Sequence, residues 1–264
     1  MSMDKRGLLT RNPFPAVLKE KFVSLRDPAV QTSAATPARM ISIIIPAHNE
    51  ERYIEKTLEA LSRQEYGWFE VIVVANGCTD KTVNVARGRC HRLIVLPQKT
   101  LGVARNLGAK MAKSELLLFL DADTLLDPQA LKTIAQEFSQ EYSAGTLKGQ
   151  PDCSRLAYRI LYGLKNFVHW SGLHGGSSGV IVCWKKDFIR AGGFDEGLEV
   201  RENSHLIRRL LRFGRYHFNS RVSATTSMRR YDRQGCVRMF WMWFKLWFHS
   251  WFGDLHARRY ETVR

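Results

Sequence analysis

The segment Glu115-Leu-Leu-Leu-Phe-Leu-Asp-Ala-Asp123 decides the fold of this chain. Its five large apolar residues, 116–120, suffice for one strand buried on both faces and are too few for a typical helix. The run stops at two carboxylates spaced i, i+2. Since alternate side chains of an extended chain share one face, we expect Asp121 and Asp123 to emerge together at the carboxyl end of a strand, where open α/β sheets bind ligands.

Two acids that converge in this way favour a hard divalent cation such as Mg²⁺ or Mn²⁺, which also binds phosphate oxygens. The alternative is a strand that ends in an ordinary Asp-rich turn, because Asp is common in turns. The preceding sequence favours the ligand site. A second strand candidate, Ile41–Ile45, ends at Pro46. It is followed by a predicted amphipathic helix with Asn49 as its N-cap.

Further strands and helices alternate along this half of the chain. We predict strands at 69–75 and 93–96, a helix at 82–88, and another helix into which the segment 102–108 leads. Asp80 is predicted to cap the helix at 82–88, and contact with a ligand is the alternative. Alternation of strands with helices predicts parallel pairing with right-handed crossovers, and therefore a sheet of the nucleotide-binding type.

Five motifs, in order and at this spacing, resemble those of the family 2 inverting glycosyltransferases of the GT-A fold, over roughly residues 40–215. They are Ile-Ile-Pro-Ala-His-Asn-Glu-Glu (44–51), Val-Ile-Val-Val-Ala-Asn-Gly-Cys-Thr-Asp (71–80), Gly-Val-Ala-Arg-Asn-Leu-Gly (102–108), Phe-Leu-Asp-Ala-Asp (119–123) and Gly-Gly-Phe-Asp-Glu (192–196). The resemblance implies an α/β fold with a mixed, mainly parallel sheet flanked by helices. It also implies transfer of a sugar from a nucleoside diphosphate sugar, with inversion.

The resemblance assigns roles to individual positions. Asp121 and Asp123 match the acids that hold the metal, Mg²⁺ or Mn²⁺, and Asp123 is the usual direct ligand and a catalytic residue. The positions that match the nucleotide-binding residues are Pro46, Ala47, Asn49, Glu50, Asn76, Arg105 and Asp121. The family shows paired Asp residues after its third strand, whereas this chain has Ala75 and Asn76, so the selected base stays open. Arg105 matches a residue near the diphosphate, and a solvated helix-face Arg is the alternative.

The family's usual general base is an Asp at the head of a later helix, where this chain has Asn203. An amide cannot take a proton usefully at neutral pH, so the neighbouring Glu202 is the predicted base, with His205 behind it. One alternative is that Asn203 caps the helix with Glu202 outside the first turn. Another is an anionic acceptor, such as a lipid phosphate, that needs no base. Contacts to acceptor or diphosphate are expected from Asp195, Arg229 and Arg230, although the two arginines could instead form a solvated cluster.

The carboxyl-terminal part is basic and aromatic. From Arg201 onward there are 14 Lys and Arg residues against 4 Asp and Glu residues, a net charge of +10 out of +15 for all 264 residues. Large aromatic residues recur at helical spacing between Phe240 and Phe252, too short a stretch to cross a bilayer. We predict an amphipathic aromatic helix on the membrane surface; packing against protein is the alternative.

We divide the chain into a tail or linker (1–39), a GT-A domain (40–225, with a nucleotide-sugar half at 40–125 and an acceptor half at 126–225, which includes the glycine-rich Gly172–Gly179) and a membrane-surface extension (226–264). Five scattered cysteines and no signal peptide indicate a cytoplasmic protein, peripherally bound to the cytoplasmic membrane. The acceptor is expected to be lipid-linked or a glycan. A nucleotidyltransferase, a non-catalytic nucleotide or nucleic-acid binder, and a degenerate transferase are the alternatives; the chain shows none of the named nucleic-acid motifs, so no nucleic-acid partner is expected.

Overall fold

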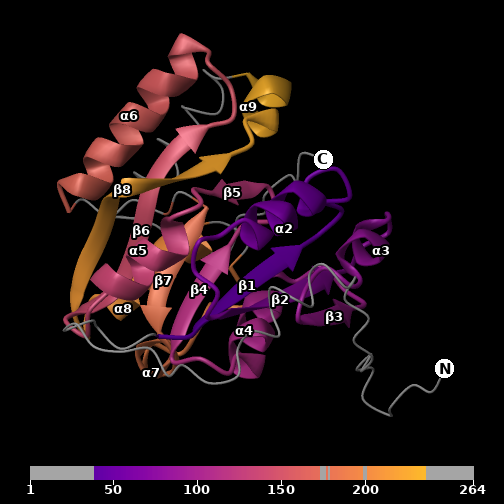
Figure 1. Ribbon diagram of the computed structural model, residues 1–264, viewed down its shortest axis with the longest axis horizontal. Helices are drawn as coiled ribbons and strands as arrows, with labels where there is room; N and C mark the ends of the chain where they lie inside the picture. Colours follow the sequence, from indigo (N-terminus) through magenta and orange to yellow (C-terminus); the bar gives the residue numbers. More distant parts are fainter. Residues whose placement is uncertain (1–38, 173–176, 178, 199–200, 236–264) are drawn as a thin grey trace.

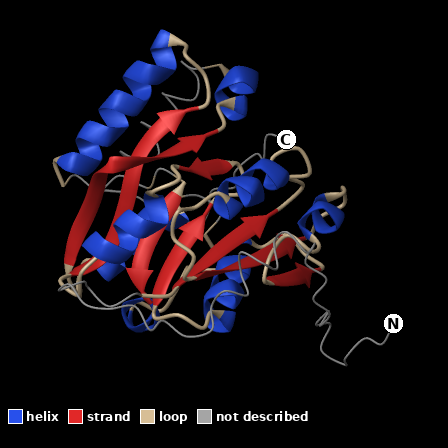
Figure 2. Ribbon diagram, in the orientation of Figure 1, coloured by secondary structure: helices blue, strands red, loops and turns tan. Residues whose placement is uncertain are grey.

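A computed structural model describes residues 39–172, 177, 179–198 and 201–235, and shows one mixed sheet with helices packed against both faces (Figures 1 and 2). The elements are β1 (Ile41–Ala47), α2 (Ile54–Ser62), β2 (Phe69–Asn76), α3 (Thr82–Ala86), β3 (Arg92–Leu96), α4 (Leu101–Met111), β4 (Leu116–Leu120), β5 (Thr124–Leu126), α5 (Ala130–Glu137), β6 (Tyr142–Pro151), α6 (Leu156–Trp170), β7 (Val180–Trp184), α7 (Lys185–Arg190), α8 (Glu202–Leu210), β8 (Arg215–Thr226) and α9 (Arg229–Gln234).

The strand order is β3-β2-β1-β4-β7-β6-β8-β5. The first half of the chain forms the predicted parallel arrangement, since β1 pairs in parallel with β2 and β4, and β2 with β3. In the second half β7 is antiparallel to β4 and β6, whereas β6 and β8 are parallel. The sheet is therefore mixed, and its parallel part places the carboxyl ends of β1, β2 and β4 at one edge.

Burial on both faces explains why β4 is apolar throughout and β1 is apolar except for Ser42. Ile43 of β1 belongs to one core cluster and Ile44 to the other, and β4 alternates in the same way. The first cluster includes the buried faces of α2 and α5. The second includes those of α4, α7 and α8. Figure 1 shows these two sets of helices on opposite sides of the sheet.

A third, smaller cluster joins α6 to α9. Tyr158 and Tyr162 of α6 are buried against Met228 and Tyr231. The strand β8 that leads into α9 also pairs with the short strand β5, with Thr226 opposite Thr124. Since β5 follows Asp123 directly, these contacts hold the start of α9 beside the acidic motif.

Two local predictions were wrong. The chain does not continue as a strand through the two acids: β4 ends at Leu120, and the amide of Thr124 donates to the carbonyl of Asp121 (3.1 Å), which closes a turn. Asn49 does not cap α2, which begins at Ile54 after a turn in which Asn49 has a positive φ of 54°. The predicted aromatic helix at 240–252 lies outside the described residues. Among those that are described, every helix is too short or too polar to span a bilayer.

Candidate functional site

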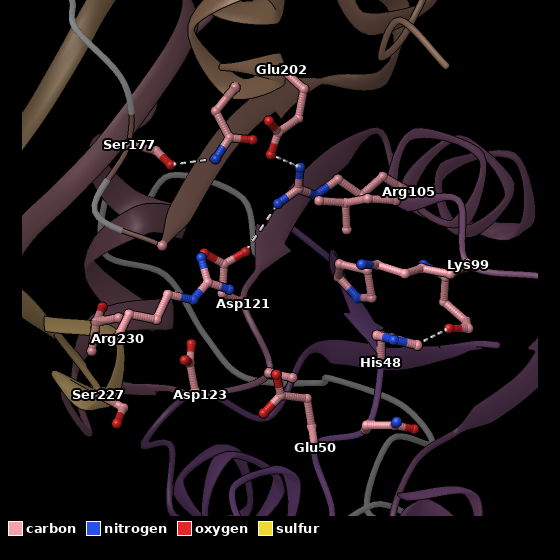
Figure 3. Close-up of a pocket in the computed structure, with 18 of the residues that line it drawn as sticks. His48, Glu50, Lys99, Arg105, Asp121, Asp123, Ser177, Glu202, Ser227 and Arg230 are labelled. Atoms are coloured by element: carbon pink, nitrogen blue, oxygen red, sulfur yellow. Dashed lines mark hydrogen bonds and ion pairs between the residues drawn. The ribbon is translucent and has the colours of Figure 1, made fainter. Parts of the chain in front are cut away.

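A pocket of about 280 Å³ lies where β1, β2 and β4 end (Figure 3). It gathers most of the residues singled out by sequence, since Pro46, Asn49, Glu50, Asn76, Arg105, Asp121, Asp123, Glu202 and Arg230 all line it. Ala47 is buried outside the lining, where its carbonyl accepts a hydrogen bond from Cys78 Sγ (3.3 Å). Asp195 also lies outside; its Oδ1 accepts from the amide of Gly197 (3.0 Å).

The loops after β1 and β2 are tied together by side chains that accept from backbone amides. Asn49 Oδ1 accepts from the amide of Thr79 (2.8 Å). Asp80 accepts from the amides of Thr82 (2.9 Å) and Glu51 (3.1 Å). It lies one residue before Lys81, which occupies the N-cap position of α3. Burial would raise the pKa of Asp80, but these hydrogen bonds and that from the Thr82 hydroxyl outweigh it and hold the pKa below its ordinary value. The network fixes both loops before any ligand binds.

Asn76 stands at the end of β2, in the position predicted to contact the nucleotide base. Its side chain is buried and Oδ1 accepts from the amide of Thr100 (2.8 Å), while its carbonyl accepts from Nδ1 of His48 (2.7 Å). Lys99 lines the same part of the pocket. The Oδ1 atom of Asn76 is thus committed to a neighbouring loop, so hydrogen bonds to a base edge would come from its amide donors.

Arg105 lies between two carboxylates, rather than on the solvated helix face considered as its alternative. Its side chain is only 4 % exposed, and the guanidinium donates to Asp121 Oδ1 (3.0 Å) and to Glu202 Oε1 (2.9 Å), as Figure 3 shows. The guanidinium also lies over the ring of Phe194, 4.9 Å from its centroid. One cation therefore offsets two acids that would otherwise repel one another in the pocket.

The motif at 102–108 explains how α4 presents that arginine. A Cβ atom at Gly102 would lie 2.9 Å from the carbonyl oxygen of Asp195, and one at Gly108 would overlap Ile44 of β1. Asn106 accepts from the amide of Phe194 (2.8 Å) and donates to its carbonyl (2.9 Å). The small residues and the Asn thus pack α4 against both β1 and the loop at 192–196, and Arg105 points from the same helix into the pocket.

Asp123 is the most deeply placed acid of the site. Its carboxylate Oδ2 lies 3.0 Å from Arg229 Nη2, which also binds Glu50 Oε1. The side chains of Asp123, Glu50 and Arg229 are only 11 %, 14 % and 10 % exposed. Burial raises the pKa of Asp123 to about 6, although Arg229 acts in the opposite direction. Arg229, and after it Arg230, supply the countercharge of this carboxylate.

Arg230 and Glu202 approach the acids from the other half of the chain. Arg230 extends into the pocket toward Asp121 (Figure 3), rather than into solvent. Glu202 is the first residue of α8 and Arg201 precedes the helix, so the predicted cap at Asn203 is wrong. The Asn203 side chain instead donates to Ser177 Oγ (3.0 Å). Among the residues considered for the base, Glu202 is the carboxylate that lines the pocket at this helix.

The donor set fits a divalent cation that shares its shell with a ligand. Within the described ranges, no group of three or more His, Cys, Asp or Glu side chains is arranged to hold an ion. Asp121 and Asp123 nevertheless line one pocket. Mg²⁺ is commonly bound by one or two carboxylates together with substrate phosphates and water, so these two acids suffice if a diphosphate supplies the remaining ligands.

Several residues that line the pocket were not predicted from the sequence. Tyr162 and Lys165 come from the inner face of α6, and Ser227 and Tyr231 from the turn after β8 and from α9. They lie 39 residues or more from Asp123 in the sequence, so no local pattern shows that they are close to the acidic motif. The glycine-rich segment was expected on the acceptor side, and Ser177 and Gly179 do line the pocket.

Comparison with known proteins agrees with this geometry. Residues 42–174 match the family model described as glycosyl transferase family 2. Validoxylamine A glucosyltransferase from Streptomyces hygroscopicus subsp. limoneus is 35% identical over 114 residues, which cover 40% of this chain and 25% of that protein. The 4,4'-diaponeurosporenoate glycosyltransferase of Staphylococcus haemolyticus is 32% identical over 141 residues, 50% of this chain and 35% of that protein. The chain thus spans only about a quarter to a third of the length of these relatives.

Solved structures show the same fold. TarS 1–349 from S. aureus, in complex with UDP-GlcNAc, superposes with a TM-score of 0.57 at 22% identity, covering 72% of this chain and 59% of that one. The mannosyltransferase PcManGT from Pyrobaculum calidifontis, in complex with GDP-Man and Mn²⁺, superposes with a TM-score of 0.58 at 19% identity, covering 87% and 71%. With the matched family model and a GT-A sheet in place, the chain belongs to glycosyl transferase family 2.

Proposed function

We propose that this protein transfers a sugar from a nucleoside diphosphate sugar to an acceptor hydroxyl, with inversion at the anomeric carbon. One observation carries the proposal: acids from β4, α8 and the β1 loop meet arginines from α4 and α9 around one pocket. Such a mixture of charges suits a substrate whose diphosphate is anionic and whose sugar carries hydroxyl groups.

The nucleoside half of the donor is proposed to lie against the loops after β1 and β2, with Pro46, Asn49, Glu50 and Asn76 around it. The matching relatives and the neighbouring structures with UDP-GlcNAc and GDP-Man support a nucleotide-sugar donor. The carboxylate of Glu50 would accept hydrogen bonds from ribose or base donors, after exchanging part of its contact with Arg229.

Asp121 and Asp123 are the residues that would hold a divalent cation, Mg²⁺ or Mn²⁺, against the diphosphate. When bound, such an ion stabilises the negative charge that develops on the leaving diphosphate. Arg230, which lines the pocket, and Arg229, which binds Asp123, would add positive charge on the same side. Arg105 keeps Asp121 and Glu202 in place while the charge shifts.

In the proposed reaction the acceptor oxygen attacks the anomeric carbon as the bond from that carbon to the diphosphate oxygen breaks. The proton of the acceptor hydroxyl moves to Glu202. Arg105 occupies Oε1 of Glu202, so Oε2 is the atom that would take the proton. An acceptor that is already anionic would not need this step, and Glu202 would then orient it.

The acceptor is proposed to be lipid-linked or a glycan at the cytoplasmic face of a membrane. The support is the basic, aromatic sequence at 226–264, which is of the type that lies on membrane surfaces. We propose that this extension keeps the enzyme peripherally attached, close to an acceptor that is anchored in the bilayer.

The test begins with donor binding, measured as a thermal shift with UDP-, GDP- and TDP-sugars, each with and without Mn²⁺. A donor that binds only the native state raises its stability, by about 2.7 kcal/mol at a hundredfold excess over Kd. Asp123→Asn should abolish the part of the shift that needs Mn²⁺ and should stop donor turnover. Wild-type turnover by a folded Asp123→Asn protein would refute the proposal.

A further inference from the structure

The outer face of α6 carries a stripe of exposed large apolar side chains. Leu156, Ile160, Leu164, Phe167 and Trp170 are 70 %, 63 %, 51 %, 58 % and 71 % exposed. Their spacing of four, four, three and three residues places them on one side of the helix. The rings of Phe167 and Trp170 pack on each other, with centroids 5.9 Å apart, rather than on the sheet. Contiguous exposed apolar surface of this kind marks an interaction site.

The stripe does not result from a helix that is poorly packed. The opposite side of α6 buries Tyr158, Tyr162 and His169, and Asn166 exchanges two hydrogen bonds with the backbone of Gly149 in β6 (both 2.9 Å). Two of the side chains that turn inward, Tyr162 and Lys165, line the pocket. One helix of about 10 Å width therefore separates the pocket from the exposed stripe.

Charge decides among the possible occupants of this face. Helix α6 contains the exposed Arg159 and no acid, and the exposed Arg155 precedes it. The neighbouring α9 adds the exposed Arg233 and Asp232, and Asp232 pairs with Arg155 (2.6 Å). Lys165, Arg229 and Arg230 face the pocket instead. A second copy would bring an equally basic surface against the stripe. Residues 236–264 of the same chain are also basic, with five Arg and Lys against two acids. An anionic bilayer complements both the charge and the apolar side chains.

We infer that the outer face of α6 is a membrane-docking surface that lies in the interface of an anionic bilayer, with Phe167 and Trp170 among the acyl chains and Arg159 at the headgroups. This contact is separate from the one proposed for residues 226–264. Only the biological role of this surface rests on the proposed function. Helix α6 would touch lipid on one side and lines the pocket on the other, so a lipid-linked acceptor would enter beside Tyr162 and Lys165.

The experiment uses the full chain and flotation with vesicles of phosphatidylcholine, alone or mixed with phosphatidylglycerol. Phe167→Glu is compared with Ile189→Glu, a matched control in α7, because Ile189 is 66 % exposed and α7 lies at the opposite end of the molecule (Figure 1). We expect binding that needs phosphatidylglycerol and weakens with salt. Phe167→Glu should lower the partition coefficient about tenfold, the loss expected for one buried aromatic side chain, and Ile189→Glu should change it less than about twofold.

A triple variant, Ile160→Glu with Leu164→Glu and Phe167→Glu, sharpens the result, because its partition coefficient should fall further still. Wild-type flotation by the triple variant would overturn the inference. The inference would also be overturned if the triple variant melted at a lower temperature than the wild type without vesicles and floated equally well. That result would mean that residues 236–264 cover the outer face of α6. Loss of a concentration-dependent dimer with unchanged flotation would assign the face to a second copy.

Donor binding separates this inference from the proposed function. None of the three substituted side chains lines the pocket, so the thermal shift with a nucleotide sugar should be the same in wild type and variants. If the wild-type protein shows no such shift yet Phe167→Glu floats poorly, the proposed function fails and the docking surface stands.

Discussion

The guanidinium of Arg229 lies 3.0 Å from the carboxylate of Asp123, although the two residues are 106 positions apart in the chain. The same guanidinium binds Glu50 and lies over the ring of Tyr53, 4.2 Å from its centroid. One side chain from α9 therefore neutralises two acids of the pocket. This contact links the carboxyl-terminal turn of the described chain to the proposed metal ligand.

Replacing Arg229 with Met should destabilise the ligand-free protein. Both acids are almost buried and would lose their shared countercharge, and breaking such a pair costs on the order of 3 kcal/mol. Urea unfolding at neutral pH measures the loss. Arg229→Lys keeps the charge and is the control, with a smaller expected effect. If the Met variant unfolds at the wild-type urea concentration, Arg229 does not hold these acids in solution.

Glu202→Gln should lower turnover by a factor of about 100 or more, because the amide cannot take the acceptor's proton. Gln can still accept from Arg105, so folding and donor binding should be unchanged. Initial rates with a hydroxyl acceptor compare the turnover of the variant with that of the wild type, and the thermal shift with the donor compares their donor binding. Adding Asn203→Asp to this variant places a carboxylate where the family usually has its base, and should recover part of the rate. A Gln variant as fast as wild type would exclude Glu202 as the base.

Asn106→Ala should weaken the attachment of the loop at 192–196. The variant removes an acceptor for the amide of Phe194 and a donor to its carbonyl. Two lost hydrogen bonds to a partly buried backbone should cost about 2 kcal/mol of unfolding free energy. Asn106→Asp retains the acceptor but sets a carboxylate against the carbonyl of Phe194 and the carboxylate of Glu196, so it should not recover the lost stability. Equal stability of the Ala variant and the wild type in urea would show that packing by Gly102 alone secures this loop.

Asp80 should stabilise the protein at neutral pH and not in acid. Its folded pKa lies below the unfolded value of 3.8, so the stabilisation is present above that pH and is lost as the pH falls through the folded pKa. Asp80→Ala removes the acceptor of hydrogen bonds from Glu51 and Thr82 and should therefore cost about 1 kcal/mol near pH 7, and the difference should narrow below about pH 4. Melting temperatures of the wild type and the Asp80→Ala variant, measured from pH 7 to below pH 4, test whether the stability difference shrinks as the pH falls. A difference independent of pH would mean that ionisation of Asp80 contributes nothing.

The parallel half of the fold could be predicted from sequence because its signals are local. Leu116–Leu120 is apolar throughout and Ile41–Ile45 is apolar except for Ser42, as expected for strands buried on both faces, and turns follow both. The alternation argument for Asp121 and Asp123 failed in detail, since the chain turns at Asp121, yet both acids still line the pocket. Strand direction was enough to place them.

The rest depends on contacts that no local pattern reveals. Helix α6 was not predicted, because apolar residues occur on both of its sides and blur the period that an amphipathic helix shows. Arg105 was predicted near a diphosphate, but its bonds to Asp121 and Glu202 join residues 16 and 97 positions away. The role of Arg229 between Glu50 and Asp123 depends on how β8 returns to β5.

The pairing of Thr124 with Thr226 holds the start of α9, and with it Arg229, beside Asp123, and this matters for shortened versions of the protein. A stop codon placed to remove the aromatic tail must come after Gln234, because ending the chain at the last strand would also delete the cation that serves Asp123. Loss of activity in such a truncation would then be mistaken for loss of the proposed membrane attachment. Cuts beyond residue 235 keep the two effects apart.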